Sequence, residues 1–373
     1  MTKSFINITR WLVGLLFIFS GLVKANDPLG LSYKMQEFFD LWQTSFLNDY
    51  SLTFSIIIIA FEIIAGVALL LGWQMKLFSW LLLLLIVFFT FLTGFAYLSG
   101  KFKNCGCFGD CLPITPLASF IKDLALLGMI GFLFYHRERI KPLFSKSISI
   151  SLIILSAVLS LGFQWYVLKY LPLVDCLPFK TENNISEKMK IPANAIPDSF
   201  AIVFVYEKNG KQFDFSPAEL PTDLDSYTFV ERKDKLVRQG NAEPAIKGFS
   251  LNTLTDADST EAILQSAGYS ILFFINDHTK NEVLHLKGGP LEKAFNLAKQ
   301  KNIPAYAVSN TGENIKAQFE EMGWEIPVLK IDFTAFRTAA RANPVIYLIK
   351  KGTVINKWPQ AETEDFINTI EKL

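Results

Sequence analysis

Three of the four cysteines lie within seven residues, in the segment Asn104-Cys-Gly-Cys-Phe-Gly-Asp-Cys111, and the fourth is Cys176. Three chemistries use such a cluster. A dithiol can pass electrons by thiolate exchange, a metal can bind several thiolates, or a static disulfide can fix the loop. The Cys-x-Cys-x3-Cys spacing is unusual for zinc. We therefore favour a redox centre at Cys105, Cys107 and Cys111, with a structural disulfide as the alternative and no metal.

The pairing of the cysteines stays open. A bond between Cys105 and Cys107 would be strained, and strained disulfides tend to be the labile, oxidising ones. Cys111 or Cys176 would then be the resolving partner. Four cysteines allow three full pairings, and the sequence does not choose among them.

Charged residues interrupt the apolar stretches that flank this cluster. Glu62 lies inside one stretch, and Lys122 and Asp123 lie inside another. Charges in a membrane segment are costly and usually have a reason. In one interpretation, Lys122 or Asp123 pairs with Glu62 or Lys24 and fixes helix packing. In the other, these four residues form a proton path or a polar pocket for a quinone head group. Both interpretations predict side chains that face the bundle interior.

Five apolar stretches are long enough to cross a bilayer, which takes about 20 helical residues. They are residues 7–23, 52–73, 77–99, 116–135 and 147–168. Hydrophobic residues make up 51% of the chain and charged residues 19%, below the roughly 25% of soluble domains. The apolar stretches therefore predict an integral membrane protein with lipid as a partner, and the lack of a basic stripe in the second half argues against nucleic acid.

Lysine and arginine in the short connections predict the orientation. The N-terminus, the turn at Lys76 and residues 137–146 are the basic connections. We expect five transmembrane helices in a bacterial inner membrane, with a cytoplasmic N-terminus. The cysteines and the C-terminal part are then periplasmic, where disulfides persist.

The second half reads as a soluble α/β region. Prolines mark a connector over 172–196. Asn209-Gly210 between apolar runs predicts a hairpin, and residues 227–237 suggest a second one, so a small β unit follows the connector. From about residue 246, strands and helices alternate: strands at 270–275, 303–308, 343–349 and 353–358, and helices at 291–301, 312–322 and 363–372.

A family resemblance rests on several separated motifs. The motifs are Arg10-Trp-Leu-Val-Gly-Leu-Leu-Phe-Ile-Phe-Ser-Gly-Leu-Val-Lys24, Glu62-Ile-Ile-Ala-Gly66, the cysteine loop and Phe120-Ile-Lys-Asp123. Residues 5–137 thereby resemble the DoxX/MauE membrane family. The resemblance implies a four-helix bundle, similar to vitamin K epoxide reductase-type bundles, with links to quinone-dependent oxidation or to disulfide maturation. The fifth helix and the extension resemble the larger Bacteroidota members.

The strand and helix order of the C-terminal part resembles a thioredoxin-like domain. Pro344 would match the cis-proline of that fold. The position of the family's Cys-x-x-Cys reads Asn276-Asp-His-Thr-Lys280, and no cysteine lies beyond Cys176. The resemblance therefore implies a domain that exchanges no disulfides itself, with Pro344 and His278 as candidate partner-binding residues.

The expected organisation is a membrane bundle over 1–140, a fifth helix over 141–171, a connector with a small β unit over 172–245, and a thioredoxin-like domain over 246–373. We expect a thiol/disulfide relay that joins a periplasmic protein client to membrane quinone. Such a relay would be a quinone-linked thiol/disulfide oxidoreductase. No covalently bound cofactor is expected. The alternative is a non-catalytic scaffold whose thioredoxin-like domain binds a periplasmic partner. The sequence does not determine the oligomeric state.

Overall fold

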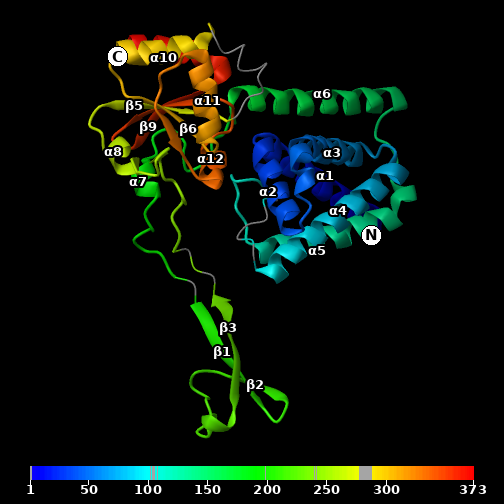
Figure 1. Cartoon of the computed structure of the whole chain (residues 1–373). Coiled ribbons are helices and arrows are strands. Elements are labelled where there is room, and N and C mark those ends of the chain that lie inside the picture. Colours follow the sequence, from blue (N-terminus) through cyan, green and yellow to red (C-terminus); the bar gives the residue numbers. More distant parts are fainter. Residues whose placement is uncertain are drawn as a thin grey trace.

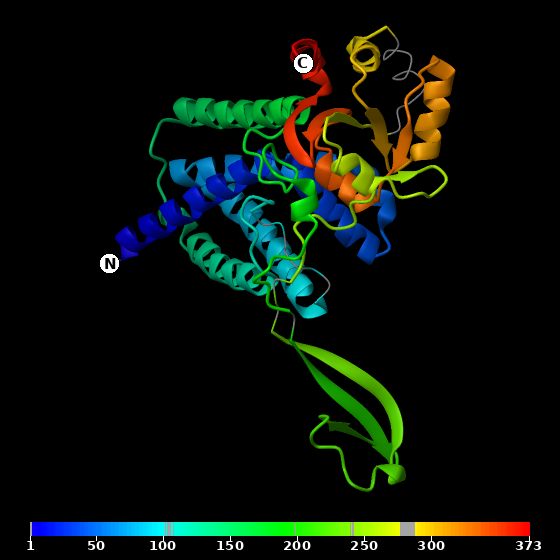
Figure 2. The same cartoon turned by 90° about the vertical axis from the view of Figure 1, so that its left-hand side faces the viewer.

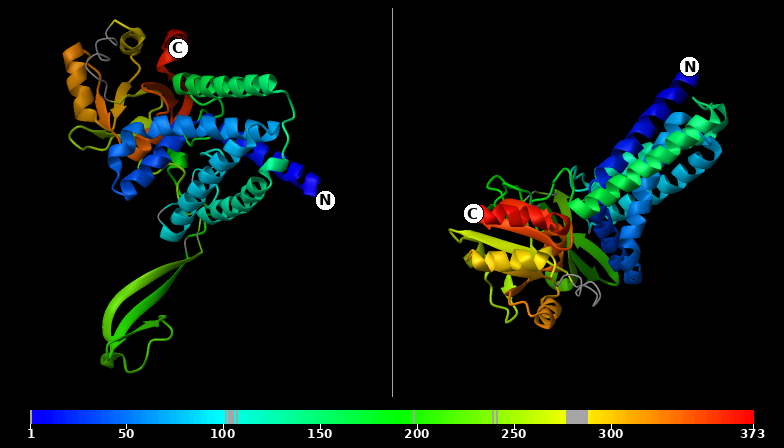
Figure 3. Two further views of the ribbon diagram at one scale, coloured as in Figure 1. Left: turned by 90° about the vertical axis from the view of Figure 1, so that its right-hand side faces the viewer. Right: turned by 90° about the horizontal axis from the view of Figure 1, so that it is seen from above.

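The computed structural model describes residues 2–100, 102, 106, 108–197, 199–238, 240, 242–276 and 288–373. Among these residues, five helices are long and apolar enough to cross a bilayer, as the sequence predicts. Figure 3 shows them gathered into one bundle, with the N-terminus at the end away from the soluble region. The helices are α1 (Thr2–Ala25), α3 (Ser51–Leu71), α4 (Met75–Ser99), α5 (Pro116–Tyr135) and α6 (Lys146–Tyr170).

Small residues bring α1 and α3 into close contact. A Cβ atom on Gly66 would lie 2.8 Å from the carbonyl oxygen of Gly14, and one on Gly14 would lie 3.1 Å from the carbonyl oxygen of Gly66. Without a hydrophobic force between helices in lipid, such small-residue contacts let two backbones approach. This approach sets Lys24 of α1 beside Glu62 of α3.

The connection between the first two apolar stretches is largely helical. α2 spans Pro28–Leu41, and the 3-10 helix η1 spans Ser45–Tyr50. Asp27 caps α2 by accepting a hydrogen bond of 3.0 Å from the backbone N–H of Gly30. Pro28 suits the first turn, because the N–H it lacks has no helical partner there. α2, an amphipathic helix of 14 residues, is shorter than the roughly 20 residues that cross a bilayer.

The C-terminal region is a thioredoxin-like domain, as the sequence predicts. Its sheet has the order β4-β7-β6-β5-β8-β9. β7, β6 and β5 pair in parallel, β8 pairs antiparallel with β5, and β9 pairs antiparallel with β8. The strands are β4 (Asn252–Thr253), β5 (Tyr269–Phe274), β6 (Ala305–Ser309), β7 (Val328–Lys330), β8 (Val345–Lys350) and β9 (Thr353–Pro359). β7 is an element that the sequence analysis missed, because three residues carry no readable period.

Helices cover both faces of this sheet (Figures 1 and 2). One apolar core contains side chains of α10, α11 and α13, and the other contains side chains of α8 and α12. The helices are α8 (Thr260–Leu264), α10 (Pro290–Gln300), α11 (Gly312–Met322), α12 (Phe333–Ala339) and α13 (Thr363–Glu371). The short helix α12 was also missed, and it ends beside the polar junction described below.

The segment after α6 packs into the same domain. Phe179 and Ile185 are fully buried in the core that contains Tyr347. The short helix α7 spans Ile185–Lys188. Asn184, just before it, forms a β-bridge with Thr353, the first residue of β9. The prolines exclude a long helix here, and tertiary contacts hold the segment against the sheet.

A separate three-stranded ribbon projects from the molecule (Figures 1 and 2). It contains β1 (Ser199–Lys208), β2 (Lys211–Phe215) and β3 (Thr228–Arg238), in the order β2-β1-β3. Asn209 and Gly210 both have positive φ, as the predicted two-residue hairpin requires. The second hairpin expected over 227–237 is wrong, because that stretch is one continuous strand paired with β1.

Candidate functional site

Cys111 and Cys176 form a disulfide, with Cα atoms 4.9 Å apart. Cys111 belongs to the loop between α4 and α5, and Cys176 follows α6, so the bond joins segments 65 residues apart. Both residues are half-buried. Of the three full pairings, this one leaves Cys105 with Cys107, and those two cysteines lie outside the described residues.

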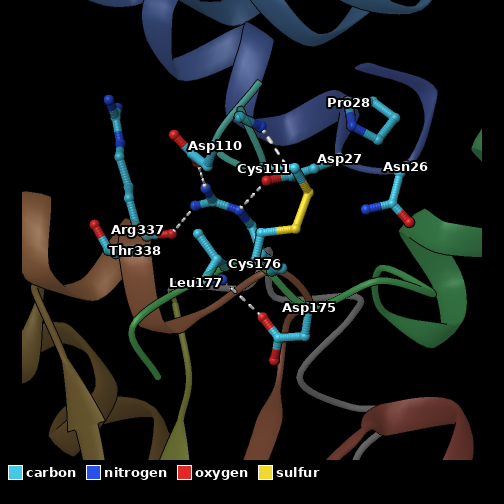
Figure 4. A network of polar contacts seen from close by, with 12 residues as sticks. Asn26, Asp27, Pro28, Asp110, Cys111, Asp175, Cys176, Leu177, Arg337 and Thr338 are labelled. Atoms are coloured by element: carbon cyan, nitrogen blue, oxygen red, sulfur yellow. Dashed lines mark hydrogen bonds and ion pairs between the residues drawn. A yellow bond between two sulfur atoms is a disulfide. The ribbon is translucent and has the colours of Figure 1, made fainter. Parts of the chain in front are cut away.

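Arg341 holds the thioredoxin-like domain against the bundle through Asp27 and Asp110. Figure 4 shows these two carboxylates beside the Cys111–Cys176 disulfide. Its Nε donates to Asp27 at 2.8 Å, and its Nη2 donates to Asp110 at 2.9 Å. A third hydrogen bond runs from Nη1 to the backbone carbonyl of Arg337. The arginine side chain is only 5% exposed. One guanidinium therefore joins the start of α2, the cysteine loop and the end of α12.

Two carboxylates stabilise the positive charge of Arg341 at this junction. Burial opposes the charge on Arg341, but the carboxylates of Asp27 and Asp110 outweigh it and raise the pKa of the guanidinium above its usual value. Burial also raises the pKa of the neighbouring Tyr33 phenol, so this tyrosine is neutral at physiological pH. Arg341 lies 5.2 Å and Arg337 4.8 Å from the centre of the Tyr33 ring.

Two hydrogen bonds and one ion pair also tie the segment after α6 into the junction. Asn26 donates to the carbonyl of Val174 at 2.8 Å and accepts from the Val174 N–H at 3.0 Å. Lys357 of β9 pairs with Asp175. The disulfide therefore lies where the bundle, the cysteine loop and the thioredoxin-like domain meet.

Replacing Arg341 with alanine is expected to weaken the junction by about 2–5 kcal/mol, because it leaves Asp27 and Asp110 partly buried without their cation. Chemical denaturation of the full chain in detergent, with protease cleavage around residue 341, measures the loss. Lys316→Ala is the matched control, since Lys316 forms an exposed pair with Glu320 that is worth at most about 1 kcal/mol. Equal losses of stability in the two variants would show that Arg341 does not hold the domain against the bundle.

A cavity of about 60 Å³ lies inside the bundle, room for a few water-sized groups. Two ion pairs border it, Lys24–Glu62 at 2.5 Å and Lys122–Asp123 at 2.5 Å. Ser20 donates to Glu62 at 3.2 Å, and Thr93 donates to Asp123 at 3.0 Å. The rest of the wall is mainly apolar, and includes Leu16, Phe17, Leu31, Met35, Phe38, Ile86, Phe89, Leu92 and Leu126.

The predicted charged residues therefore do come together inside the bundle. The sequence analysis missed Ser20 and Thr93, since hydroxyl residues in apolar helices commonly bond to their own backbone. The partners also differ from those expected. Glu62 pairs with Lys24 of α1, and Asp123 pairs with its neighbour Lys122.

The cysteine loop reaches this cavity. Gly106, which stands between Cys105 and Cys107, contributes to the cavity wall. Lys122 Nζ lies 5.3 Å from the centre of the Phe108 ring, and Phe108 packs against Phe19. The same loop continues to Asp110 and Cys111 at the junction. It thus spans the distance between the two polar sites.

The remaining expectations have separate outcomes. The Asn343–Pro344 peptide bond is cis, as predicted from the thioredoxin-like pattern. Arg341, just before it, contacts the bundle, so this loop faces the chain's own membrane half. His278 lies outside the described residues. Among the residues that are described, no cluster of histidine, cysteine and carboxylate side chains is arranged to hold a metal. Arg341 itself had no sequence signal, because its two carboxylate partners, Asp27 and Asp110, lie more than 200 positions away.

Two known proteins are similar to parts of this chain. The curated protein TlpB of Flavobacterium psychrophilum is 30% identical over 129 residues, which are 34% of this chain and 35% of that protein. The match thus spans about a third of that relative. The solution structure of a thiol:disulfide interchange protein from Bacteroides sp. is 19% identical, covers 34% of this chain and 84% of that one, and superposes with a TM-score of 0.27.

Two family models also match. Residues 200–239, which contain the ribbon, match a domain of unknown function, DUF8463. Residues 2–136 match the family described as methylamine utilisation protein MauE. The membrane bundle from α1 to α5 therefore matches the MauE family, in agreement with the motifs of its cysteine loop and helices.

Proposed function

We propose that the chain is a thiol–disulfide relay of the bacterial inner membrane, which carries electrons from a periplasmic protein client to a quinone. The observation that carries the proposal is the path of the cysteine loop. It runs from the wall of the apolar cavity, at Gly106, to the disulfide at the junction. In the proposed topology the N-terminus is cytoplasmic, and the disulfide and the thioredoxin-like domain are periplasmic.

The client would meet the Cys111–Cys176 bond in a cleft of about 680 Å³ between α2 and α12, which Cys176 borders. A client thiolate attacks the Cys176 sulfur, and Cys111 leaves as a thiolate. A second client thiol then attacks the mixed disulfide and frees Cys176. The client loses two electrons and two protons and gains a disulfide, while Cys111 and Cys176 become thiols.

The electrons then move along the cysteine loop. The Cys111 and Cys176 thiols exchange with a Cys105–Cys107 disulfide. This exchange restores the Cys111–Cys176 disulfide and leaves Cys105 and Cys107 reduced. A quinone at the cavity would take the two electrons and two protons from that pair and leave as the quinol. The cavity has room for only part of such a head group, so Lys24 and Lys122 would donate to a quinone carbonyl oxygen that enters it, and the apolar side chains of its wall would contact the edge of the ring.

The buried carboxylates have a defined part in this proposal. Glu62 and Asp123 hold the two lysine side chains in place, and each accepts a second hydrogen bond from a hydroxyl group. They can also hold a proton beside the acceptor. The thioredoxin-like domain, whose Arg341 is engaged with Asp27 and Asp110, acts as a cap that shapes the client cleft.

Differential alkylation of native membranes, read by mass spectrometry, tests the relay. We expect the Cys111–Cys176 bond to open when a reduced dithiol is added and to re-form when quinone is added, in the intact protein. A Cys111→Ser/Cys176→Ser double variant is the control for labelling. A bond that remains fully closed under both additions would make it a structural disulfide, and the scaffold alternative would then replace the relay.

A further inference from the structure

The ribbon exposes an apolar face. In the strand register Tyr206 stands opposite both Phe213 and Phe229, and Phe204 stands opposite Phe215. Phe200 and Phe229 are each 53% exposed, and Phe213 is 40% exposed. Exposed apolar patches on a protein commonly mark sites of interaction with another molecule.

The outer edge of β3 offers the means of extension. In the described sheet, β3 is an edge strand 11 residues long, and its outer backbone groups have no neighbouring strand. Long exposed edges readily pair with another chain, and proteins usually protect them. The other edge strand, β2, has five residues. The question is which strand β3 would accept.

We propose that β3 pairs antiparallel with β3 of a second copy of this chain, about a two-fold axis at Lys233. In that register Arg232 of one copy stands opposite Asp234 of the other. Glu231 likewise stands opposite Lys235. Each opposition occurs twice, because a two-fold interface repeats every contact. Directly opposed unlike charges and apolar pairs stabilise a sheet, whereas like charges destabilise it.

The sequence of β3 is therefore complementary to its own reverse, which is the specific argument for a second copy. Charges on an edge usually prevent pairing, but here the signs match under the two-fold rotation. The one like-charged opposition is Lys233 with itself, and Glu231 of the second copy is its diagonal neighbour. β2 lacks this property, since the same operation would set Gln212 against Asp214 and Lys211 against Phe215.

The charges of β3 are free to change partners. Within one chain Arg232 pairs with Asp234 at 2.8 Å, and Lys233 with Glu231 at 3.1 Å. All four side chains are about half exposed. Exposed ion pairs of this kind contribute little to stability. Exchanging them for ion pairs across the interface therefore costs little stability.

The membrane half limits how two copies can be related. Copies in one membrane share an orientation, so a two-fold axis that relates them runs along the membrane normal. A strand that pairs antiparallel with its own copy must run across that axis. Figures 1 and 3 show the ribbon crosswise to α6, one of the candidate membrane-spanning helices.

Cysteine cross-linking in native membranes tests the register. Lys233→Cys places the two new thiols opposite each other at the axis, so mild oxidation is expected to convert most of the chain into a dimer joined at position 233. Lys211→Cys, on the opposite edge of the ribbon, is the matched control and should remain largely uncross-linked. A 233–233 bond identified by mass spectrometry supports the pairing. Equal cross-linking at both positions, or none at either, overturns it.

Charge reversal tests the complementarity without an added thiol. Arg232→Asp and Asp234→Arg each create two like-charged oppositions, so each variant alone is expected to be monomeric by light scattering in detergent. Co-expressed, the two variants restore both oppositions as unlike pairs, and a heterodimer should form. The Arg232→Asp/Asp234→Arg double variant should also dimerise. Dimers of either single variant, or a monomeric wild type that binds lipid vesicles through the ribbon, would overturn the proposal.

Discussion

Replacing Cys107 with serine is expected to lower quinone-coupled oxidation of a dithiol client by more than about a hundredfold, since removing one member of a chemical unit removes nearly all of its catalysis. In the proposed relay the client still reduces Cys111–Cys176, but the electrons have no onward path. Alkylation should therefore find Cys111 and Cys176 trapped as thiols after the client is added, even with quinone present.

Two comparisons make this result specific. Cys176→Ser should stop the relay one step earlier, so that Cys105 and Cys107 stay oxidised in the presence of client. Leu112→Ala, an exposed neighbour in the same loop, should retain activity. If Cys107→Ser oxidised the client with quinone as fast as the unaltered protein, electron transfer through the cysteine loop would be refuted.

Replacing Glu62 with leucine is expected to destabilise the bundle by about 3–5 kcal/mol, because Lys24 would remain buried without its ion-pair partner. Lys24 and Glu62 have side chains 5% and 1% exposed, so water cannot readily replace the lost carboxylate. Unfolding of the full chain in mixed micelles, followed by helical circular dichroism against denaturant concentration, measures the change.

The double variant Lys24→Met/Glu62→Leu separates packing from chemistry. Replacing both partners of a buried pair by apolar residues is often close to neutral for stability, so most of the lost stability should return. If the pair also serves the acceptor pocket, the double variant should fold and still fail to pass electrons to quinone. A stable and fully active double variant would assign the pair to helix packing alone.

The sequence by itself determined the long helices and most of the strands of this protein, but not the short elements α12 and β7. The five apolar stretches predict the long helices to within a few residues, because membrane spans are recognised by length and composition. Asn209-Gly210 predicts the hairpin between β1 and β2, since both residues tolerate positive φ. The alternation after residue 246 predicts most of the thioredoxin-like domain. Each of these signals depends only on residues that are neighbours in the sequence, so the sequence is enough to recognise it.

The tertiary structure alone decided which of those elements meet. Cys111 joins Cys176, Glu62 joins Lys24, and Arg341 joins Asp27 and Asp110. Each cysteine, carboxylate and arginine has several partners of suitable chemistry in the chain, and proximity in space selects among them. Local patterns report how one segment folds, whereas disulfides and buried ion pairs depend on how separate segments pack. For that reason the cysteine cluster was visible in the sequence, and the junction built around it was not.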